Sequence, residues 1–431
     1  MSHARCDRLY APRAGVQAWE PLRRCAGVGA APPVCRRGSR SAGARRRVRR
    51  STPARSGALR RALGRRRLAL DDLVANRQRG RVSSSPLGFD PNGPAIGNGI
   101  YGLPHTAEDA RVVLVPVPWE PTVSYRRGAA KGPGAILRAS RQVDLFDLHT
   151  GRPYEQGIAM LDVDPDIVRW NAEACAAAEP VIAAHGEVAG DRDLEARLAA
   201  VNALSRRLNE RVTEIALRWM ERGKLVGVIG GDHSSPYGAI AAHAAHYPGM
   251  GILHIDAHAD LRNAYEGFTD SHASIMHNVA TNHPTIPRIV QVGLRDMSED
   301  ELRFIRESNG RIVAHIDASI ADRLFEGEPF HLIADSIVED LPDDVYVSFD
   351  IDGLDPTLCP STGTPVPGGL TFQQAVALIG RIQKSGRRIV GFDLNEVAPK
   401  DDADDWDGNV GARLLYKLIG FTLLSHDTRN R

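Results

Sequence analysis

The sequence predicts an α/β fold built around a parallel β-sheet. Short apolar segments that are typical of buried strands alternate with longer segments whose apolar residues recur every three or four positions, as on amphipathic helices. Strands separated by helices are normally parallel, because the chain must cross back over the sheet before the next strand begins. Four of the apolar segments also lead directly into groups of His and acidic residues. In folds of this class, ligands bind beyond the carboxyl ends of the strands.

The first part of the ordered chain is predicted to contain one strand and three helices. A Ser-, Gly- and Pro-rich linker precedes a strand at 111–117, and a helix at 132–140 begins with Pro133 in its first turn, where a missing N–H has no cost. The Ala-rich segment near residue 175 predicts a short helix. Apolar residues at three- and four-residue steps predict a long amphipathic helix over 193–222, which ends at a glycine.

The rest of the chain repeats the alternation of strands and helices. Two further helices are predicted at 371–382 and 410–424. The predicted strands cover residues 224–229, 251–255, 288–292, 311–316, 345–349 and 388–392.

The charge distribution divides the chain into two parts, which we interpret as an Arg-rich N-terminal extension with its linker (residues 1–95) and a catalytic domain (residues 96–431). The formal net charge is only +1, but residues 1–81 contain 22 Arg, no Lys and four acidic residues, so this stretch carries +18 and the remainder −17. The extension has little apolar periodicity and much Ala, Gly, Ser and Pro, which favours disorder or weak helix.

Three interpretations of the extension stay open. It could be a basic arm for nucleic acid or a membrane surface, or an organellar transit peptide, which is also Arg-rich, Ser-rich and poor in acidic residues. It could also result from translation upstream of the true start, because Arg without Lys is typical of GC-rich DNA read outside a coding region. We favour this last interpretation, and no mechanism below depends on the choice.

Composition indicates a globular cytoplasmic protein. Apolar residues make up 42% and charged residues 25% of the 431 residues, and no window reaches the ~18 consecutive apolar residues that a membrane span requires. Five cysteines without a repeated spacing argue against a disulfide framework. Of the two outside the extension, Cys359 lies between two motifs described below but has no neighbouring base to activate it, so we interpret it as a packing residue.

The segment His254–Asp260 (HIDAHAD) follows a predicted strand and contains the first candidate metal ligands. Asp256, His258 and Asp260 are two residues apart, so in an extended segment their side chains point the same way. Converging charges at the end of a core strand cost several kcal/mol each unless a cation neutralises them. On its own, the motif could also be an exposed acidic loop with a stray histidine.

Three more strand ends strengthen the metal interpretation. The strands that end near residues 229, 349 and 392 lead into GGDHS, DIDGLDP and DLNEVAP. Because parallel strands end at the same edge of a sheet, these groups are expected to meet there. Carboxylate-rich sets with some imidazole suit Mn²⁺, with Ni²⁺, Co²⁺ or Fe²⁺ as alternatives, and paired divalent ions activate water for hydrolysis. The expected ligands are His233, Asp256, His258, Asp260, Asp350 and Asp352.

Taken together, GGDHS (230–234), DAHAD (256–260), SFDIDGLDP (348–356), GTPVPGGL (363–370) and DLNEVAP (393–399) resemble the ureohydrolase family, which includes arginase and agmatinase. The resemblance spans roughly residues 112–424. It implies an arginase-like three-layer α/β/α domain with a central parallel sheet, two Mn²⁺ ions, hydrolysis of a guanidino group to urea, and a homo-oligomer, trimer or hexamer.

The resemblance also implies residue roles. One metal is expected on His233, Asp256, Asp260 and Asp350, and the other on Asp256, His258, Asp350 and Asp352. Glu396 matches the carboxylate that pairs with the guanidinium, and Thr364 matches a residue that supports the substrate. His272 matches the histidine that moves a proton to the leaving amine, although a surface-loop histidine is the alternative.

Substrate identity is less well defined by the sequence. Residues 261–263 and 268–271 depart from the arginase pattern, and residues 261–276 are similar to agmatinases and guanidine hydrolases. An acidic run after Glu396 (Asp401, Asp402, Asp404, Asp405 and Asp407) could attract the distal ammonium of agmatine, although such a run is usually just solvated. Trp406 and the loop that contains Thr122 look more like guanidine hydrolases. A Trp face over a small planar cation contributes ~1 to 2 kcal/mol, although Trp406 could simply pack under the last helix.

We expect a small guanidino substrate, guanidine slightly ahead of agmatine, with no membrane and no nucleic-acid partner. The alternatives are another guanidino-acid amidinohydrolase, such as a guanidinobutyrase or arginase, or a catalytically silent family member with a regulatory or binding role.

Overall fold

The protein contains a single eight-stranded parallel sheet in the part of the chain that the structure describes. The structure is a computed structural model that describes residues 89–401 and 406–428. The strands pair in the order β2-β1-β3-β8-β7-β4-β5-β6, and every pairing is parallel. The predicted parallel α/β fold is therefore confirmed.

The strands alternate with helices along the chain. The strands are β1 (Val112–Val117), β2 (Ile158–Met160), β3 (Leu225–Gly230), β4 (Gly251–Ile255), β5 (Ile289–Leu294), β6 (Ile312–Ile316), β7 (Asp344–Asp350) and β8 (Arg388–Asn395). The helices are α3 (Gly132–Ala139), α4 (Pro165–Ala183), α5 (Arg192–Glu221), α6 (Tyr237–His246), α7 (Ile275–Asn282), α8 (Glu299–Glu307), α9 (Asp317–Phe325), α10 (Phe330–Glu339), α11 (Phe372–Lys384) and α12 (Trp406–Thr428).

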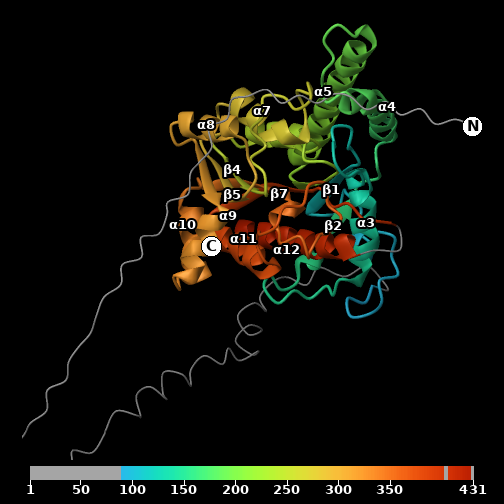
Figure 1. The fold of residues 1–431 in the computed structure, drawn as a ribbon. Coiled ribbons are helices and arrows are strands. Elements are labelled where there is room, and N and C mark those ends of the chain that lie inside the picture. Colours follow the sequence, from blue (N-terminus) through green and yellow to red (C-terminus); the bar gives the residue numbers. More distant parts are fainter. Residues whose placement is uncertain (1–88, 402–405, 429–431) are drawn as a thin grey trace, which may run out of the picture. The chain divides into compact units, whose positions relative to one another are not determined.

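Helices cover both faces of the sheet, which makes a three-layer α/β/α arrangement (Figure 1). Helices α3, α10, α11 and α12 share one apolar core with the sheet, whereas α4 to α7 close the other face through two smaller cores. Every residue of β1, β3, β4 and β5 is buried. That burial explains why these strands are continuous apolar runs instead of alternating ones.

Most predicted elements are confirmed within one or two residues, and the differences have local causes. Helix α4 is longer than the short helix predicted, since it begins at Pro165 with Asp164 as its N-cap and continues past Pro180. Strand β2 has only three residues, too few to show a pattern. Helix α6 was not predicted because six of its ten residues are buried and its apolar residues are not confined to one stripe.

Residues 1–88, which make up most of the predicted Arg-rich extension, lie outside the described residues. Phe89 is partly buried against the main core, so the compact body includes residues before the predicted start at residue 96. Among the described residues, no helix is both long and apolar enough to cross a bilayer.

The sheet order places the candidate site. Strands β3, β8, β7 and β4 are direct neighbours, although they lie far apart along the chain. These are the four strands that end in the polar groups GGDHS, DLNEVAP, DIDGLDP and DAHAD. The expected meeting of four strand ends is therefore a property of the fold.

Candidate metal centre

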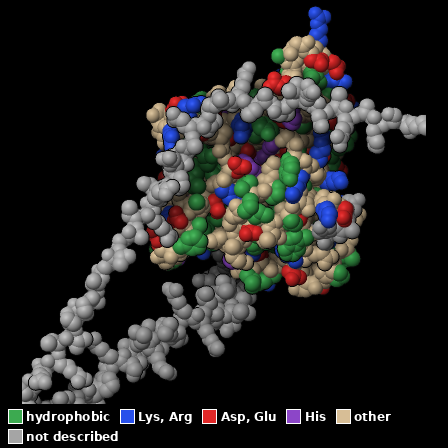
Figure 2. Space-filling model, viewed as in Figure 1, with side chains coloured by type: hydrophobic (Ala, Val, Ile, Leu, Met, Phe, Trp, Pro, Cys, Tyr) green, Lys and Arg blue, Asp and Glu red, His purple; other side chains and the backbone are tan. Residues whose placement is uncertain are grey.

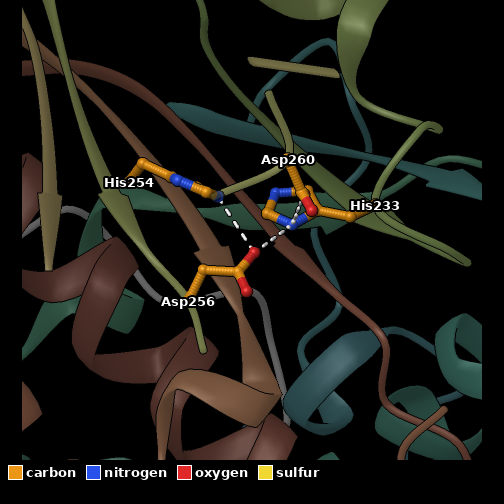
Figure 3. A group of neighbouring side chains, drawn as sticks. All are labelled: His233, His254, Asp256 and Asp260. Carbon is orange, nitrogen blue, oxygen red and sulfur yellow. Dashed lines mark hydrogen bonds and ion pairs between the residues drawn. The ribbon is translucent and has the colours of Figure 1, made fainter. Parts of the chain in front are cut away.

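His233 contacts a first group of carboxylates. Figure 3 shows two of them, Asp256 and Asp260, with their oxygens turned toward the His233 ring. Its Nδ1 atom lies 2.9 Å from Asp256 Oδ2, 3.4 Å from Asp260 Oδ2 and 3.2 Å from Asp350 Oδ2. All four side chains are at least 94% buried. The structure thus brings together the four residues predicted for the first ion.

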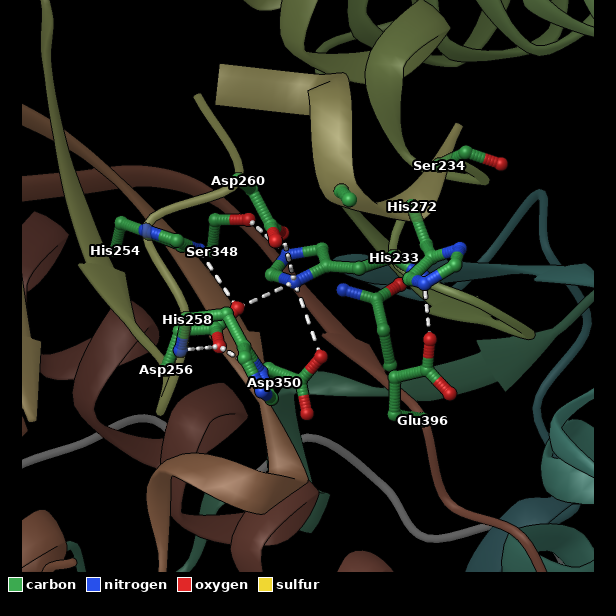
Figure 4. Close-up of polar contacts among 12 residues, drawn as sticks. His233, Ser234, His254, Asp256, His258, Asp260, His272, Ser348, Asp350 and Glu396 are labelled. Carbon is green, nitrogen blue, oxygen red and sulfur yellow. Dashed lines mark hydrogen bonds and ion pairs between the residues drawn. The ribbon is translucent and has the colours of Figure 1, made fainter. Parts of the chain in front are cut away.

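His258 and Asp352 form a second group that shares Asp256 with the first. Figure 4 shows His258 beside Asp256. The Nδ1 atom of His258 lies 3.1 Å from Asp352 Oδ2 and 3.4 Å from Asp256 Oδ1. Asp350 joins this group through its Oδ1, which accepts the N–H of Asp352 at 2.8 Å. Asp256 therefore stands between the two histidines, as expected of a carboxylate that bridges two ions.

The hydrogen bonds of His233 show which of its ring nitrogens is free to bind a metal. Ser348 donates its hydroxyl proton to Asp393 at 3.0 Å, so its oxygen accepts from Nε2–H of His233, also at 3.0 Å. In the neutral imidazole, Nδ1 then carries a lone pair that faces three carboxylates. The lone pair of Nδ1 and the carboxylate oxygens that face it repel one another unless a positive charge lies between them. A divalent cation supplies such a charge.

The electrostatics of the cluster indicate the same deficit of positive charge. Burial, together with the charge of Asp256, raises the pKa of Asp260 well above its usual range, and burial with Asp352 does the same to Asp350. Burial alone would lower the pKa of His258, but Asp352 and Asp256 raise it to about 12. Four buried carboxylates with two imidazoles match the charge and the donor types of two divalent ions.

His254 is a buried residue of the site that was not predicted from the sequence. Gln291 donates an amide N–H to Nδ1 of His254 at 3.0 Å, so Nε2–H of His254 donates to Asp256 Oδ2 at 2.9 Å. His254 therefore orients Asp256 from behind, a common arrangement around metal ligands. The available signal was its position two residues before Asp256, on the same side of the strand.

Next to the cluster lies a cavity of about 190 Å³, whose lining includes His233, His258, Thr364 and Glu396. Figure 2 shows histidine side chains within a hollow on the surface of this face. Oε1 of Glu396 accepts the N–H of His233 at 3.0 Å, while its buried Oε2 has no hydrogen-bond partner. Burial and the neighbouring Asp350 raise the pKa of Glu396 well above its usual range. A cationic ligand would satisfy this carboxylate.

His272 also lines the cavity, but Thr122 does not. Thr122 is fully buried behind His272, with its Oγ1 atom 3.1 Å from His272 Nδ1 and 3.2 Å from Asp232 Oδ2. The structure therefore corrects the expectation that Thr122 contacts the substrate. Thr364 lies at the cavity, 3.4 Å from Asp352 Oδ2 through its hydroxyl.

Neither Trp406 nor any described residue of the acidic run after Glu396 lines the cavity. Trp406 is not among the residues that line the cavity, and its indole N–H donates to the carbonyl of Thr357 at 3.3 Å. Residues 402–405 lie outside the described residues, so the expectation about the run is tested only at its ends. Asp407 is buried and accepts the N–H of Ser361 at 2.9 Å, which gives it a structural role.

Comparison with known proteins agrees with the fold and with the family resemblance of the sequence. Residues 110–420 match the model of the Arginase family. An N(1)-aminopropylagmatine ureohydrolase from Thermus thermophilus is 37% identical over 314 residues, which cover 73% of this chain and 90% of that protein. An agmatinase from Cronobacter sakazakii is 30% identical over 317 residues, or 72% of this chain and 87% of that protein. The crystal structure of an agmatine ureohydrolase from Thermoplasma volcanium, 21% identical, superposes with a TM-score of 0.57 over 77% of this chain and 96% of that one.

Proposed function

The chain belongs to the arginase family, and from this premise we propose that it is a metal-dependent ureohydrolase that cleaves a C–N bond of a small guanidino compound to give urea and an amine or ammonia. The observation that supports this most is Glu396. Its buried Oε2 has no hydrogen-bond partner and belongs to the same cavity as His233, His258 and Asp350. A guanidinium is a planar cation that a carboxylate can hold by two parallel hydrogen bonds.

The proposed ligands of the first ion are His233, Asp256, Asp260 and Asp350, and those of the second are Asp256, His258, Asp350 and Asp352. We propose Mn²⁺ for both, with Ni²⁺ as the alternative, because carboxylates outnumber imidazoles and no thiolate is present in either set. When bound, such a pair supplies water activated for attack on carbon.

The side chains around the cavity would bind the substrate and transfer protons. Glu396 would hold the guanidinium over the metal cluster and so fix the reacting carbon in position. Thr364 would support the same group from the Asp352 side. His272 would accept a proton released by the attacking water and pass it to the departing amine. Burial together with the nearby His258 lowers the pKa of His272 to about 4, so the ring is neutral near pH 7 before it accepts that proton.

For the substrate we propose agmatine or a closely related guanidino amine. The two features that favoured free guanidine, Trp406 and Thr122, do not line the cavity. Asp296 and Glu301 do line it, and their carboxylates would favour a second cationic group. The relatives with 30% identity or more include enzymes named for agmatine and N(1)-aminopropylagmatine.

Free guanidine is the second candidate, because of the size and rim of the cavity. Its volume of about 190 Å³ is below the ~300 Å³ at which sites for drug-sized ligands begin. Arg262 also lines the cavity, with its Nε atom 3.7 Å from Glu301 Oε2, and it would repel a distal ammonium.

The experiment that tests the proposal is urea release by the purified full chain with added Mn²⁺ or Ni²⁺. The substrates are agmatine, guanidine, arginine and guanidinobutyrate at equal concentration. Agmatine is expected to give the highest kcat/KM, and a higher value for guanidine would select the second candidate. No urea from any of the four with metal bound would contradict the proposal and favour a binding role. We also propose a cytoplasmic homo-oligomer, trimer or hexamer, which gel filtration with light scattering would test.

A further inference from the structure

We propose that Thr122 and Asp232 are positioning residues that fix the protonation pattern of the His272 ring, so that Nδ1 carries the proton and Nε2 presents a lone pair for proton transfer. This inference rests on the proposed function of His272. Neither residue lines the cavity, so both would act only through His272.

The argument begins with the hydroxyl of Thr122, which has one proton to donate and two lone pairs that accept. Its Oγ1 atom lies 3.2 Å from Asp232 Oδ2, 3.2 Å from the backbone N of His272 and 3.1 Å from Nδ1 of His272. Thr122 is fully buried, so no bulk water competes for these contacts.

The direction of each bond follows from its partner. A backbone N–H can only donate, so it takes one lone pair of Oγ1. The carboxylate of Asp232 can only accept, so it takes the hydroxyl proton. The remaining lone pair of Oγ1 faces Nδ1 of His272, which must therefore carry a hydrogen. In a neutral imidazole, Nε2 is then unprotonated.

Asp232 is held in a fixed orientation by its other oxygen. Oδ1 accepts both the N–H of Ser234, at 3.0 Å, and the Ser234 hydroxyl. Oδ2 is thus left for Thr122. The hydroxyl of Ser271 is the other polar group near Nδ1, but it lies 3.5 Å away, at the outer limit for a hydrogen bond, and accepts the N–H of Ala273.

This arrangement makes a prediction about Asp232→Asn that a simple loss of packing would not. Because two donors from Ser234 face the Oδ1 position, the amide oxygen of Asn must take that position and the NH₂ group must face Thr122. The hydroxyl would then accept from Asn and donate to Nδ1, which would reverse the proton positions on the ring. A wrong tautomer of a catalytic histidine has a large effect on kcat in other hydrolases.

The test is steady-state urea release by the Mn²⁺-loaded full chain in four variants. We expect kcat to fall about 10- to 100-fold in Thr122→Val and further in Asp232→Asn, with KM and metal content unchanged. Thr122→Ser, which keeps the hydroxyl, should recover most of the activity. Thr422→Val is the matched control, because Thr422 is also fully buried but its hydroxyl donates only to a carbonyl within α12.

A second measurement reads the tautomer without any turnover. In the Zn²⁺-loaded protein, which is diamagnetic, the ¹⁵N shifts of labelled histidine should show Nδ1–H at His272, with His272→Gln identifying the signal. Asp232→Asn should shift the signal toward Nε2–H. An Nε2–H ring in the unchanged protein, full kcat in Thr122→Val, or loss of bound metal in that variant would each overturn the inference. A wild-type protein that releases no urea but shows Nδ1–H would instead contradict the proposed function alone.

Discussion

Replacement of Glu396 by Gln tests the proposed contact with the guanidinium while it keeps the shape of the side chain. Oε1 of Glu396 accepts the buried N–H of His233 at 3.0 Å, so the amide oxygen of Gln must occupy that position. The NH₂ group would then replace Oε2, which has no partner in the free protein. A donor would face the N–H groups of the guanidinium.

The size of the effect follows from what is lost. A hydrogen bond to a charged group contributes about 1.5–3 kcal/mol, and a buried donor left without an acceptor costs about 1–3 kcal/mol. The sum, about 2.5–6 kcal/mol, corresponds to a fall in kcat/KM of roughly 10²- to 10⁴-fold. Metal content should not change, because Glu396 is not a proposed ligand.

The assay is urea release from agmatine, together with metal analysis and thermal unfolding of each variant. Asp407→Asn is the control, since Asp407 is another buried carboxylate that accepts a backbone N–H but lies outside the cavity lining. The control should alter stability without a comparable change in kcat/KM. A kcat/KM within about threefold of the wild type in Glu396→Gln, or loss of its bound metal, would refute the assigned role.

Four further predictions concern the cluster and the core. Removal of metal with a chelator should abolish urea release and lower the Tm, because the ions bind only the folded cluster, and added Mn²⁺ should restore both. His258→Asn should reduce the bound metal from two ions per chain to one. A stoichiometry that stays at two ions would contradict the second site. Burial lowers the pKa of His243 from 6.5 to about 4, so the stability that neutral His243 contributes is present above pH 6.5 and is lost as the pH falls from 6.5 toward 4, by about 3 kcal/mol in total. Urea denaturation should show a smaller difference in unfolding free energy between pH 7 and pH 5 in His243→Leu than in the wild type. An equal difference would argue against this role. Gly231→Ala should lower the stability by about 3 kcal/mol or more, because the new Cβ would lie 1.9 Å from the carbonyl oxygen of Trp119. Gly134→Ala is the control, because its Cβ would meet only a flexible Arg side chain at 3.5 Å. Equal Tm values for the two variants would contradict the steric argument.

The sequence was sufficient to predict every strand except β2, and burial on both faces gives the central strands a distinctive composition. Strands β3 and β4 are buried along their whole length and therefore appear as uninterrupted apolar runs. The same burial hides helix α6, in which Gly238, Ala239 and Ile240 are consecutive buried residues and leave no polar face to mark the helical period.

Part of the site could also be predicted, because its metal ligands interrupt the apolar composition at the ends of the strands. Ligands that follow a strand directly, such as His233 and Asp256, are visible as a change from apolar to polar residues. The sequence assigns Thr122 to the substrate because its loop resembles that of guanidine hydrolases, yet its contacts with His272 and Asp232 depend on positions 150 and 110 residues away. No local pattern predicts on which side of His272 that hydroxyl lies.

Two residues of the site have backbone conformations that the rest of the fold must stabilise. Asp260 and Glu396 have φ values of 54° and 60°, in the left-handed region that costs side-chain-bearing residues about 1–3 kcal/mol each. Backbone hydrogen bonds hold both in place, from the N–H of His277 to the carbonyl of Asp260 at 3.0 Å and from the N–H of Glu396 to the carbonyl of Gly231 at 2.8 Å. These conformations place the Asp260 side chain in the charged cluster and the Glu396 side chain at the cavity. The negative charge of the nearby Asp350 opposes ionisation of both carboxyl groups. Backbone strain of this kind is common at functional sites, so the conformations of Asp260 and Glu396 agree with the proposed role of this edge of the sheet.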